Sequence, residues 1–458
     1  MHRLIHANPV TVIKTRRASV LLDLPSGQMA ACAGRSLAIE GSVMVEEPLS
    51  VGEWVVHDLL QASHLAPPDS LGDTIARHAQ PLGVHQATIY LADLQQLYLT
   101  PLPNGHAEKE EALSINTTLP GLSYRTVSVQ IGYAEQGRSR MWLPIVDGTE
   151  RLGVLELVVD RLDEPTLRRL SMLASLVSLL VVSKGAYSDT YARVRRTQLM
   201  SLPAEMEWAF MPARTFATDQ IVISAALEPA YAMGGDAFDY SLIGDTLHLS
   251  TFDAIGHDLS AGLIASVGMA SCRNTRRAGL DLPDMVTSTD QVIAGQFGED
   301  RFLTALLCHL HLPSGQLRWI NCGYPPPLLI RHNKPITVLD QPPRPPLGLG
   351  DAGIPVVHEE WLQPGDRLLF YSDGVTEARS AKGELFGLDQ LSNFVVRNTA
   401  EGAPAPEALR RLTHAILEHQ RGQLSDDATV IFVEWRPTNQ HRLIPHRGSD
   451  PTAAAVGA

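Results

Sequence analysis

The stretch Phe252-Asp-Ala-Ile-Gly-His-Asp258 ends a hydrophobic run that has the pattern of a β-strand. Three further segments in the second half of the chain are built in the same way, each a hydrophobic strand that ends in acids and glycines. They are Met233-Gly-Gly-Asp-Ala-Phe-Asp239, Tyr371-Ser-Asp-Gly-Val-Thr-Glu377 and Ser425-Asp-Asp-Ala-Thr429. One such segment would be an ordinary turn, because Asp and Gly adopt the backbone angles that turns need. Four of them together indicate a shared acidic site.

The region around these segments alternates strands and helices from Ile221 to about Trp435. Hydrophobic spacing predicts helices over Ser260–Arg276, Leu282–Phe297 and Pro406–Gln420. It predicts strands over Ile221–Leu227, Thr246–Asp253, Thr304–Leu312, Leu317–Cys322, Pro327–Arg331, Arg367–Ser372 and Thr429–Glu434. Many strands beside a few long helices favour an α+β layered sandwich over a doubly wound parallel sheet.

Clustered aspartates at strand ends suit Mg²⁺ and Mn²⁺, because these hard cations prefer carboxylate and carbonyl oxygens. Two such ions that share a water lower its pKa and present hydroxide to a phosphorus atom. No cysteine or serine nucleophile is then needed. The sequence contains no Cys-x5-Arg loop and no Walker-type Gly-x4-Gly-Lys-Ser/Thr segment, so it favours metal-dependent phosphoryl chemistry.

The acidic segments resemble the stage II sporulation protein E-like branch of the PPM (protein phosphatase 2C) superfamily of metal-dependent serine/threonine phosphatases. The resemblance covers about Pro203 to Trp435 and rests on five motifs in the family's order. They are Gly234-Gly-Asp-Ala-Phe-Asp239, Asp253-Ala-Ile-Gly-His-Asp258, Asn321-Cys-Gly-Tyr-Pro-Pro326, Ser372-Asp-Gly-Val-Thr-Glu377 and Asp426-Asp-Ala-Thr429. It implies an α-β-β-α sandwich that hydrolyses phosphoserine or phosphothreonine in proteins.

The same resemblance implies a role for individual residues. Asp253 is expected to bridge two Mn²⁺ or Mg²⁺ ions, and the backbone carbonyl of Ala254 to join one of them. Asp236 is expected to serve the second ion, directly or through water. Asp373 and Asp426 are expected to complete the first. We therefore predict these four aspartates as the catalytic and metal-binding set, with Ala254 as a further metal ligand.

Asp239 and Asp427 are weaker candidates, because a turn or a strand-end cap explains either of them as well. The chain also departs from the family pattern at two positions. Asp258 replaces a glycine, so it either binds an additional cation or points to solvent, and Tyr324 stands where the family has histidine. His257 is expected to be a fold element beside the metal loop, with protonation of the leaving group as the alternative.

The chain from about Ser63 has the pattern of a helix-flanked antiparallel sheet. A helix is predicted over Leu71–Leu82, and strands over Ala87–Leu91, Gln96–Leu102, Arg140–Ile145 and Leu152–Val159. The phrases Met141-Trp-Leu-Pro-Ile-Val-Asp-Gly148 and Arg151-Leu-Gly-Val-Leu-Glu-Leu157 resemble a GAF sensory domain. That resemblance implies a small ligand between sheet and helices. A structural dimerisation module is the alternative.

A long helical run is predicted from Glu164 to about Ala204. Apolar or aromatic residues recur in it at steps of three and four, apart from Lys184, which is the spacing of a helix with one apolar seam. This seam predicts a connector through which two copies form a homodimer. Packing within the sensory domain explains its first half equally well.

Length and composition limit the other possibilities. A chain of 458 residues allows about two or three domains. A formal net charge of -13 argues against nucleic-acid binding by bulk attraction to phosphates. The four cysteines form no Cys-x-x-Cys pair, the N-terminus lacks a signal-peptide core, and the apolar stretch Leu170–Val182 is shorter than the roughly 20 residues that span a membrane. A cytoplasmic protein without membrane insertion is expected.

The predicted α+β chain divides into five parts. They are an N-terminal segment of unknown role at 1–62, a GAF-like sensory domain at 63–185, a helical connector at 186–205, a PPM-type phosphatase domain at 206–436 and a disordered tail at 437–458. The resemblance implies a bacterial phosphatase whose partner is a phosphorylated protein, an anti-sigma factor antagonist, and which the GAF-like domain regulates. The alternative is a catalytically weak or inactive scaffold that binds a partner protein. Four retained acids argue against it, since a dead site gains by losing buried charge.

Overall fold

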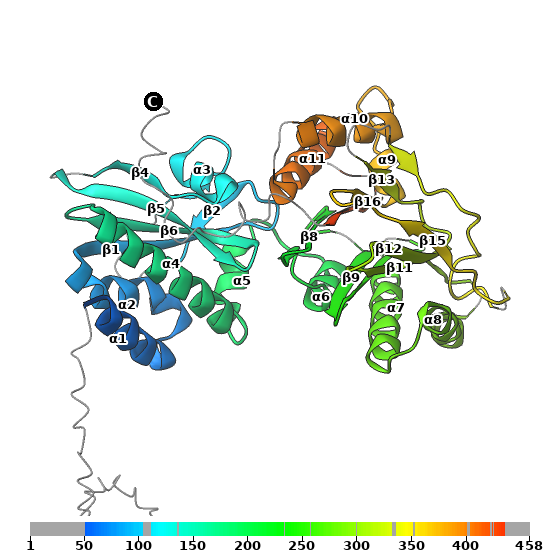
Figure 1. The fold of residues 1–458 in the computed structure, drawn as a ribbon, viewed down its shortest axis with the longest axis horizontal. Helices are drawn as coiled ribbons and strands as arrows, with labels where there is room; N and C mark the ends of the chain where they lie inside the picture. The colour runs from blue at the N-terminus through cyan, green and yellow to red at the C-terminus, as the bar shows by residue number, and fades with distance from the viewer. Residues whose placement is uncertain are drawn as a thin grey trace, which may run out of the picture. The chain divides into compact units, whose positions relative to one another are not determined.

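The computed structural model describes residues 51–435 of the chain (Figure 1). Short gaps within that range fall at 104–110, 135–136, 233, 257, 299, 332–335, 351–352, 401–403, 422–423 and 425. Residues 1–50, which make up most of the predicted N-terminal segment, and the predicted tail at 437–458 lie outside the described residues. So does His257.

A six-stranded antiparallel sheet, in the order β3-β2-β1-β6-β5-β4, forms the centre of the N-terminal lobe, which we define as residues 51–195. Its strands are β1 (Val84–Ala92), β2 (Tyr98–Pro101), β3 (Leu113–Ser114), β4 (Gln130–Tyr133), β5 (Ser139–Asp147) and β6 (Glu150–Val159). The helices are α1 (Val51–Leu65), α2 (Leu71–His78), α3 (Leu119–Thr126), α4 (Glu164–Gly185) and α5 (Asp189–Arg195). The predicted helix-flanked antiparallel sheet is therefore confirmed.

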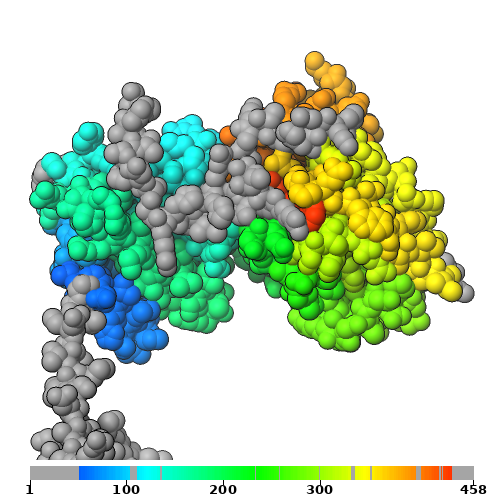
Figure 2. Space-filling view, in the orientation of Figure 1, coloured from blue at the N-terminus to red at the C-terminus, as the bar shows by residue number. Residues whose placement is uncertain are grey.

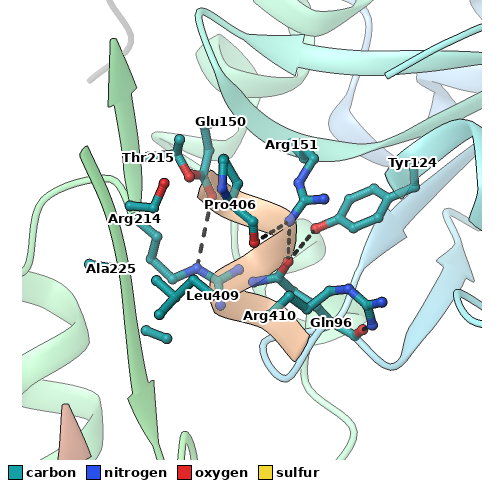
Figure 3. A pocket seen from close by; sticks show the side chains of 12 residues that line it. Gln96, Tyr124, Glu150, Arg151, Arg214, Thr215, Ala225, Pro406, Leu409 and Arg410 are labelled. Carbon is teal, nitrogen blue, oxygen red and sulfur yellow. Dashed lines mark hydrogen bonds and ion pairs between the residues drawn. The ribbon is translucent and has the colours of Figure 1, made fainter. Parts of the chain in front are cut away.

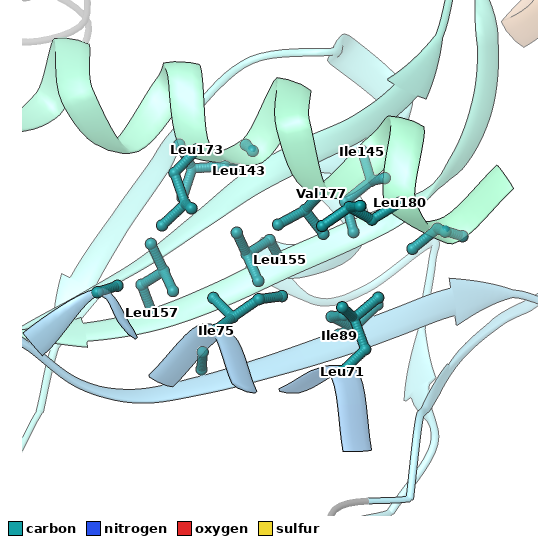
Figure 4. Close-up of a cluster of buried hydrophobic side chains, with 14 of the residues drawn as sticks. Leu71, Ile75, Ile89, Leu143, Ile145, Leu155, Leu157, Leu173, Val177 and Leu180 are labelled. Atoms are coloured by element: carbon teal, nitrogen blue, oxygen red, sulfur yellow. The ribbon is translucent and has the colours of Figure 1, made fainter. Parts of the chain in front are cut away.

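The two faces of this sheet bury different side chains because successive strand residues point to opposite sides. Ile89, Leu143 and Leu155 face the helices α1, α2 and α4 (Figure 4). Tyr90 and Trp142, their neighbours in sequence, face α3. Helix α1 adds Leu59 to the core that contains Ile89, Leu143 and Leu155. The predicted domain boundary at residue 63 therefore falls inside a helix that belongs to this lobe.

The predicted long connector is wrong as a single helix. Helix α4 ends at Gly185, α5 covers Asp189–Arg195, and α6 covers Leu202–Phe210. The apolar seam of α4 is buried against the lobe's own sheet, so the core-packing alternative explains it. Lys184, the exception in the seam, is also buried, and its Nζ donates to the carbonyls of Ser63 and Ala66.

Helix α4 is also the one described helix that is long and apolar enough to cross a membrane. Length and composition alone are weak evidence for such a span. Because Leu170, Leu173, Val177 and Leu180 pack in the core, α4 fits the other reading of the same pattern, the central helix of a folded lobe.

The C-terminal lobe, residues 202–435, consists of two antiparallel sheets. The first has the order β15-β12-β11-β10-β9 and the second the order β14-β13-β16-β17-β8-β7. The strands are β7 (Thr215–Ala217), β8 (Ile221–Glu228), β9 (Asp236–Ile243), β10 (Thr246–Ala254), β11 (Leu303–His311), β12 (Gln316–Cys322), β13 (Leu328–Ile330), β14 (Thr337–Val338), β15 (His358–Trp361), β16 (Arg367–Tyr371) and β17 (Ala428–Trp435). Strand β9 was not predicted, since its Gly-Gly-Asp start has the composition of a turn.

Helices cover both outer faces of these sheets (Figure 1). Helices α7 (Leu259–Arg277) and α8 (Leu282–Phe297) pack on the first sheet, and α10 (Gly387–Ala400) and α11 (Ala405–His419) pack on the second. Between the sheets lies a core that includes Phe238, Leu249 and Phe370. This arrangement confirms the predicted α-β-β-α sandwich.

One buried ion-pair group joins β6 of the N-terminal lobe to α11. Arg151 donates from Nη1 to Glu407 Oε2 at 3.1 Å. Its Nη2 donates to Gln96 Oε1 and to the Pro406 carbonyl, both at 3.1 Å (Figure 3). Burial raises the pKa of Glu407, but hydrogen bonds from Arg410 and the charge of Arg151 outweigh it and hold that pKa low. The pocket beside this group has a volume of about 10 Å³, which is room for roughly one water.

Candidate active site

Two of the predicted aspartates face each other across neighbouring strands of the first sheet. Asp236 is the first residue of β9 and lies opposite Asp253 of β10. Phe252 and Ala254, on either side of Asp253, pack toward α7, so Asp253 points into the space between the sheets. Asp236 is 2% exposed, and its Oδ2 accepts a hydrogen bond from Thr429 Oγ1 of the second sheet at 2.7 Å.

These two carboxylates are held in an unfavourable electrostatic environment. Burial, followed by repulsion from Asp253 and Asp427, raises the pKa of Asp236 well above its usual value, although hydrogen bonds from Thr429 and Ser372 lower it. Burial also raises the pKa of Asp253 to about 7, with further contributions from Asp373, Asp426 and Asp427. A bound divalent cation would relieve this repulsion, which is the effect a metal has on the acids that hold it.

The second sheet brings the remaining acids to the same end of the sandwich. Asp373 begins the short helix α9 (Asp373–Thr376) directly after β16, and Asp426 precedes β17; both are exposed. Burial and the charge of Asp426 raise the pKa of Asp373. On the face seen in Figure 2, the red end of the described chain lies between green and yellow segments of the C-terminal lobe.

Asp427 connects two of the acidic segments. Its Oδ2 accepts from the backbone N–H of Gly234 at 2.8 Å, and its carbonyl oxygen accepts from Ser372 Oγ at 3.2 Å. The side chain is buried, with 8% exposed. These contacts fit the strand-end cap that the sequence left open for Asp427.

Two glycines permit the close approach of the loops. A Cβ at Gly235 would lie 3.0 Å from the Gly256 carbonyl oxygen and 3.1 Å from that of Ala254. A Cβ at Gly374 would lie only 2.0 Å from the Asp427 carbonyl oxygen. Any side chain at these positions would push the acidic segments apart. The carbonyl oxygen of Ala254 thus lies close to the residue that precedes Asp236.

The described acidic side chains, as they are placed, do not form a complete coordination sphere for a metal ion. Across the described parts of residues 51–435, no group of three His, Cys, Asp or Glu side chains is close enough to hold one ion as placed. The structure brings Asp236, Asp253, Asp373 and Asp426 into electrostatic contact at one end of the sandwich. Oxygen donors, burial and mutual repulsion fit a hard divalent cation.

Asp239 does not belong to this set, so its weaker candidacy is corrected. It lies three residues after Asp236 on β9 and therefore points to the opposite face of the sheet. There its carboxylate accepts from Arg273 and Arg276 of α7, each at 2.7 Å, and is 1% exposed. Asp239 fixes α7 to the sheet.

The two departures from the family pattern have local explanations. Asp258 is the N-cap of α7, where its Oδ1 accepts from the Ala261 N–H at 3.1 Å.

Tyr324 is 3% exposed, and the side chain of Asn321 holds its backbone. Asn321 Oδ1 accepts from the Tyr324 N–H, and Asn321 Nδ2 donates to the Tyr324 carbonyl, each at 2.8 Å. Burial raises the pKa of the Tyr324 phenol well above its usual value, and Asp236 and Asp253 add to the effect. The phenol therefore borders the pair of acids.

Sequence reasoning missed Glu207, which lies on α6 and not in an acidic motif. It is 0% exposed, and its Oε1 accepts from the Gly235 N–H at 2.8 Å. Burial, with repulsion from Asp427, raises its pKa to about 8. The available signal was weak: an acid at helical spacing from Ala204 and Met211, within a short amphipathic segment.

Comparison with known proteins agrees with this geometry over the C-terminal lobe. Residues 243–436 match the family model of stage II sporulation protein E. This region is therefore similar to the stage II sporulation protein E family. The match takes in the segments around Asp253, Asp373 and Asp426, and begins after the segment that contains Asp236.

Two curated relatives align with about half of the chain. Protein IcfG of Synechocystis is 26% identical over 261 residues, which cover 50% of this chain and 40% of IcfG. The phosphoserine phosphatase RsbU of Bacillus subtilis is 22% identical over 235 residues, 51% of this chain and 69% of RsbU. The chain thus spans less than half the length of the first of these relatives.

Among solved structures, the RsbU and RsbW domains of a Mycobacterium tuberculosis protein align with 26% identity and a TM-score of 0.41. That alignment covers 48% of this chain and 61% of the mycobacterial one.

Proposed function

We propose that the chain is a metal-dependent protein serine/threonine phosphatase. The observation that carries the proposal is the pair Asp236 and Asp253, two carboxylates that lie opposite each other in register. Burial raises the pKa of both, and neighbouring carboxylates raise it further. A fold tolerates such repulsion where a cation is to be bound. The similarity to the stage II sporulation protein E family over residues 243–436 supports the same conclusion.

The residues that would hold two Mn²⁺ or Mg²⁺ ions are Asp236, Asp253, Asp373 and Asp426, with the carbonyl of Ala254. When bound, the ions supply a water of lowered pKa as the nucleophile for the phosphorus atom. The protein's own contribution is to hold the carboxylates at one end of the sandwich. The Thr429 hydroxyl fixes the Asp236 side chain for that purpose.

The test is hydrolysis of an aryl phosphate with Mn²⁺, with and without a chelator. We expect metal-dependent turnover by the parent chain, and a loss of about 100-fold or more for Asp253→Asn. Asp245→Asn, in the exposed turn between β9 and β10, is the matched control and is expected to behave like the parent. Metal-independent turnover, or equal rates for Asp253→Asn and the parent, would refute the assignment.

The proposed substrate is a phosphorylated protein, and specifically an anti-sigma factor antagonist. The name of the RsbU relative, a phosphoserine phosphatase, supports the coarser part of this proposal. Release of phosphate from a phosphoserine-containing antagonist should exceed release from a free phosphorylated metabolite. A preference for the metabolite would contradict the proposed substrate class.

We further propose that the chain works in the cytoplasm and that its N-terminal lobe is a GAF-like sensory domain that regulates the phosphatase. The buried Arg151–Glu407 ion pair gives the two lobes a direct contact through which a ligand or a second copy of the chain could act. Arg151→Met should alter turnover of a protein substrate while leaving Mn²⁺ affinity unchanged. Unaltered turnover would leave this contact without a regulatory role.

A further inference from the structure

Glu207 combines complete burial with an incomplete set of hydrogen bonds. Its Oε1 accepts from Gly235, the residue before Asp236, whereas its Oε2 is buried without a hydrogen-bond partner among the described residues. A buried carboxyl with an unbonded oxygen costs folding free energy. Local features that oppose stability in this way are expected at functional sites rather than in a packed core.

The loop that Glu207 contacts is held by carboxylates from two directions. Gly234 donates its N–H to Asp427 at 2.8 Å, Gly235 donates to Glu207 at 2.8 Å, and the Asp236 N–H lies 3.4 Å from Asp427. Three consecutive amides thus point at acids from α6 and from the segment before β17. This loop leads directly into Asp236, the first residue of β9, which lies opposite Asp253.

Helix α6 is a firm support for this contact. Trp208 donates its Nε1 to the Ala230 carbonyl at 2.8 Å, and Ser201 caps the helix by accepting from the Ala204 N–H. On the other side, α6 packs so closely on α7 that a Cβ at Gly262 would lie 3.1 Å from Pro203. Glu207 therefore reaches the loop from a helix that is fixed on two sides.

We propose that Glu207 is a positioning residue for metal binding. It accepts the Gly235 N–H and so holds the Gly234–Asp236 turn in the conformation that presents Asp236 to the ion. The proposal rests on the proposed function. It adds a residue outside the stage II sporulation protein E match, on the helix that precedes the sandwich.

The experiment is Mn²⁺ binding to the full chain by calorimetry, without substrate. Glu207→Leu keeps much of the side-chain volume but removes the acceptor, and we expect it to weaken binding by about 10-fold or more, as for other outer-sphere partners of metal ligands. Glu207→Gln keeps an acceptor oxygen and should restore most of the affinity. Glu205→Leu, exposed on the same helix, should bind as the parent does.

Two further readouts separate positioning from a general loss of structure. Thermal unfolding of Glu207→Leu without metal should occur close to the parent's temperature, because the substitution removes a buried carboxyl but also leaves the Gly235 N–H without its acceptor. Amide hydrogen exchange at Gly235 should become faster in Glu207→Leu and stay near the parent's rate in Glu207→Gln.

The outcomes distinguish this proposal from the proposed function. Parent-like Mn²⁺ affinity in Glu207→Leu overturns the positioning role alone. Equal losses in Glu207→Gln and Glu207→Leu also overturn it, because the carboxylate charge and not the hydrogen bond would then matter. If the parent chain binds no Mn²⁺, or Asp253→Asn binds as well as the parent, the proposed function fails and this proposal fails with it.

Discussion

Strand β9 carries two aspartates, three residues apart in one motif, whose surroundings are opposite in kind. Asp236 faces the inter-sheet space, where burial and then the neighbouring carboxylates raise its pKa. Asp239 faces α7, where Arg273 and Arg276 neutralise it. The first arrangement stores repulsion that a cation would relieve, and the second is a complete structural ion pair. The lesson is that an acid's role follows from the face of the strand on which it lies.

The sharpest test of this comparison is Asp236→Asn. With Mn²⁺ and an aryl phosphate, we expect activity to fall by about 100-fold or more, because the charge that would hold an ion is lost. Without metal, thermal unfolding should move to higher temperature, since buried repulsion is removed while the amide oxygen still accepts from Thr429. Full activity, or a metal-free protein that is less stable than the parent, would break the comparison.

Asp239→Ala should give the opposite pattern. Removing one partner of a buried ion pair leaves Arg276, which is 7% exposed, without its carboxylate. We expect the free energy of unfolding to fall by about 3 kcal/mol in urea titrations. Mn²⁺ affinity of the folded protein should remain that of the parent. A large loss of affinity with little loss of stability would return Asp239 to the metal set.

The face of β9 and β10 that packs on α7, where Asp239 pairs with Arg273 and Arg276, also predicts a pH dependence of stability. His248 and His309 lie there with Nδ1 and Nε2 2.8 Å apart. Burial, with the charge of Arg276, lowers the pKa of His248 to about 4; burial lowers that of His309 to about 3, with His248, Arg318 and Arg276 adding to the effect. Because the unfolded chain takes up these protons near pH 6.5, stability is full above that pH and is lost as the pH falls toward 4.

We expect this loss of folding free energy to be on the order of 1 kcal/mol. It is smaller than the pKa shifts alone would give, because His248 is partly exposed and solvent screens its charge. Urea unfolding of the parent and of His248→Gln between pH 7 and 4.5 checks it. The variant should lose less stability over that range. An equal pH dependence in both proteins would exclude His248 as a source.

The smallest effect is expected at Asp258, an acid beside the predicted metal loop that acts as a helix cap. Asp258→Ala should cost about 1 kcal/mol of stability, the usual value of an N-cap side chain. Mn²⁺ affinity should not fall. A measurable loss of Mn²⁺ binding by calorimetry would show that Asp258 has a direct role at the site.

Much of the sandwich could be predicted because its strands and helices carry strong local patterns. Helix α8 begins and ends at the predicted residues, and β8, β10, β11, β12, β16 and β17 lie within a residue or two of their predicted ends. Strand β9 was missed because glycines and acids at its start indicate a turn. The long connector was wrong because helical spacing continues across residues 186–188 and 196–201, where the chain leaves the helix before and after α5.

By itself, the sequence determined the α+β layered class and the four acidic segments, because hydrophobic period and motif order are local properties; the α-β-β-α arrangement was implied by the resemblance to a family. Only the tertiary structure separated Asp236 from Asp239, showed Asp258 to be a cap, and brought Glu207 to the Gly235 amide. These facts depend on which sheet face, helix and loop meet in space. The contact between Glu207 and Gly235 joins residues 28 positions apart, which no local pattern encodes.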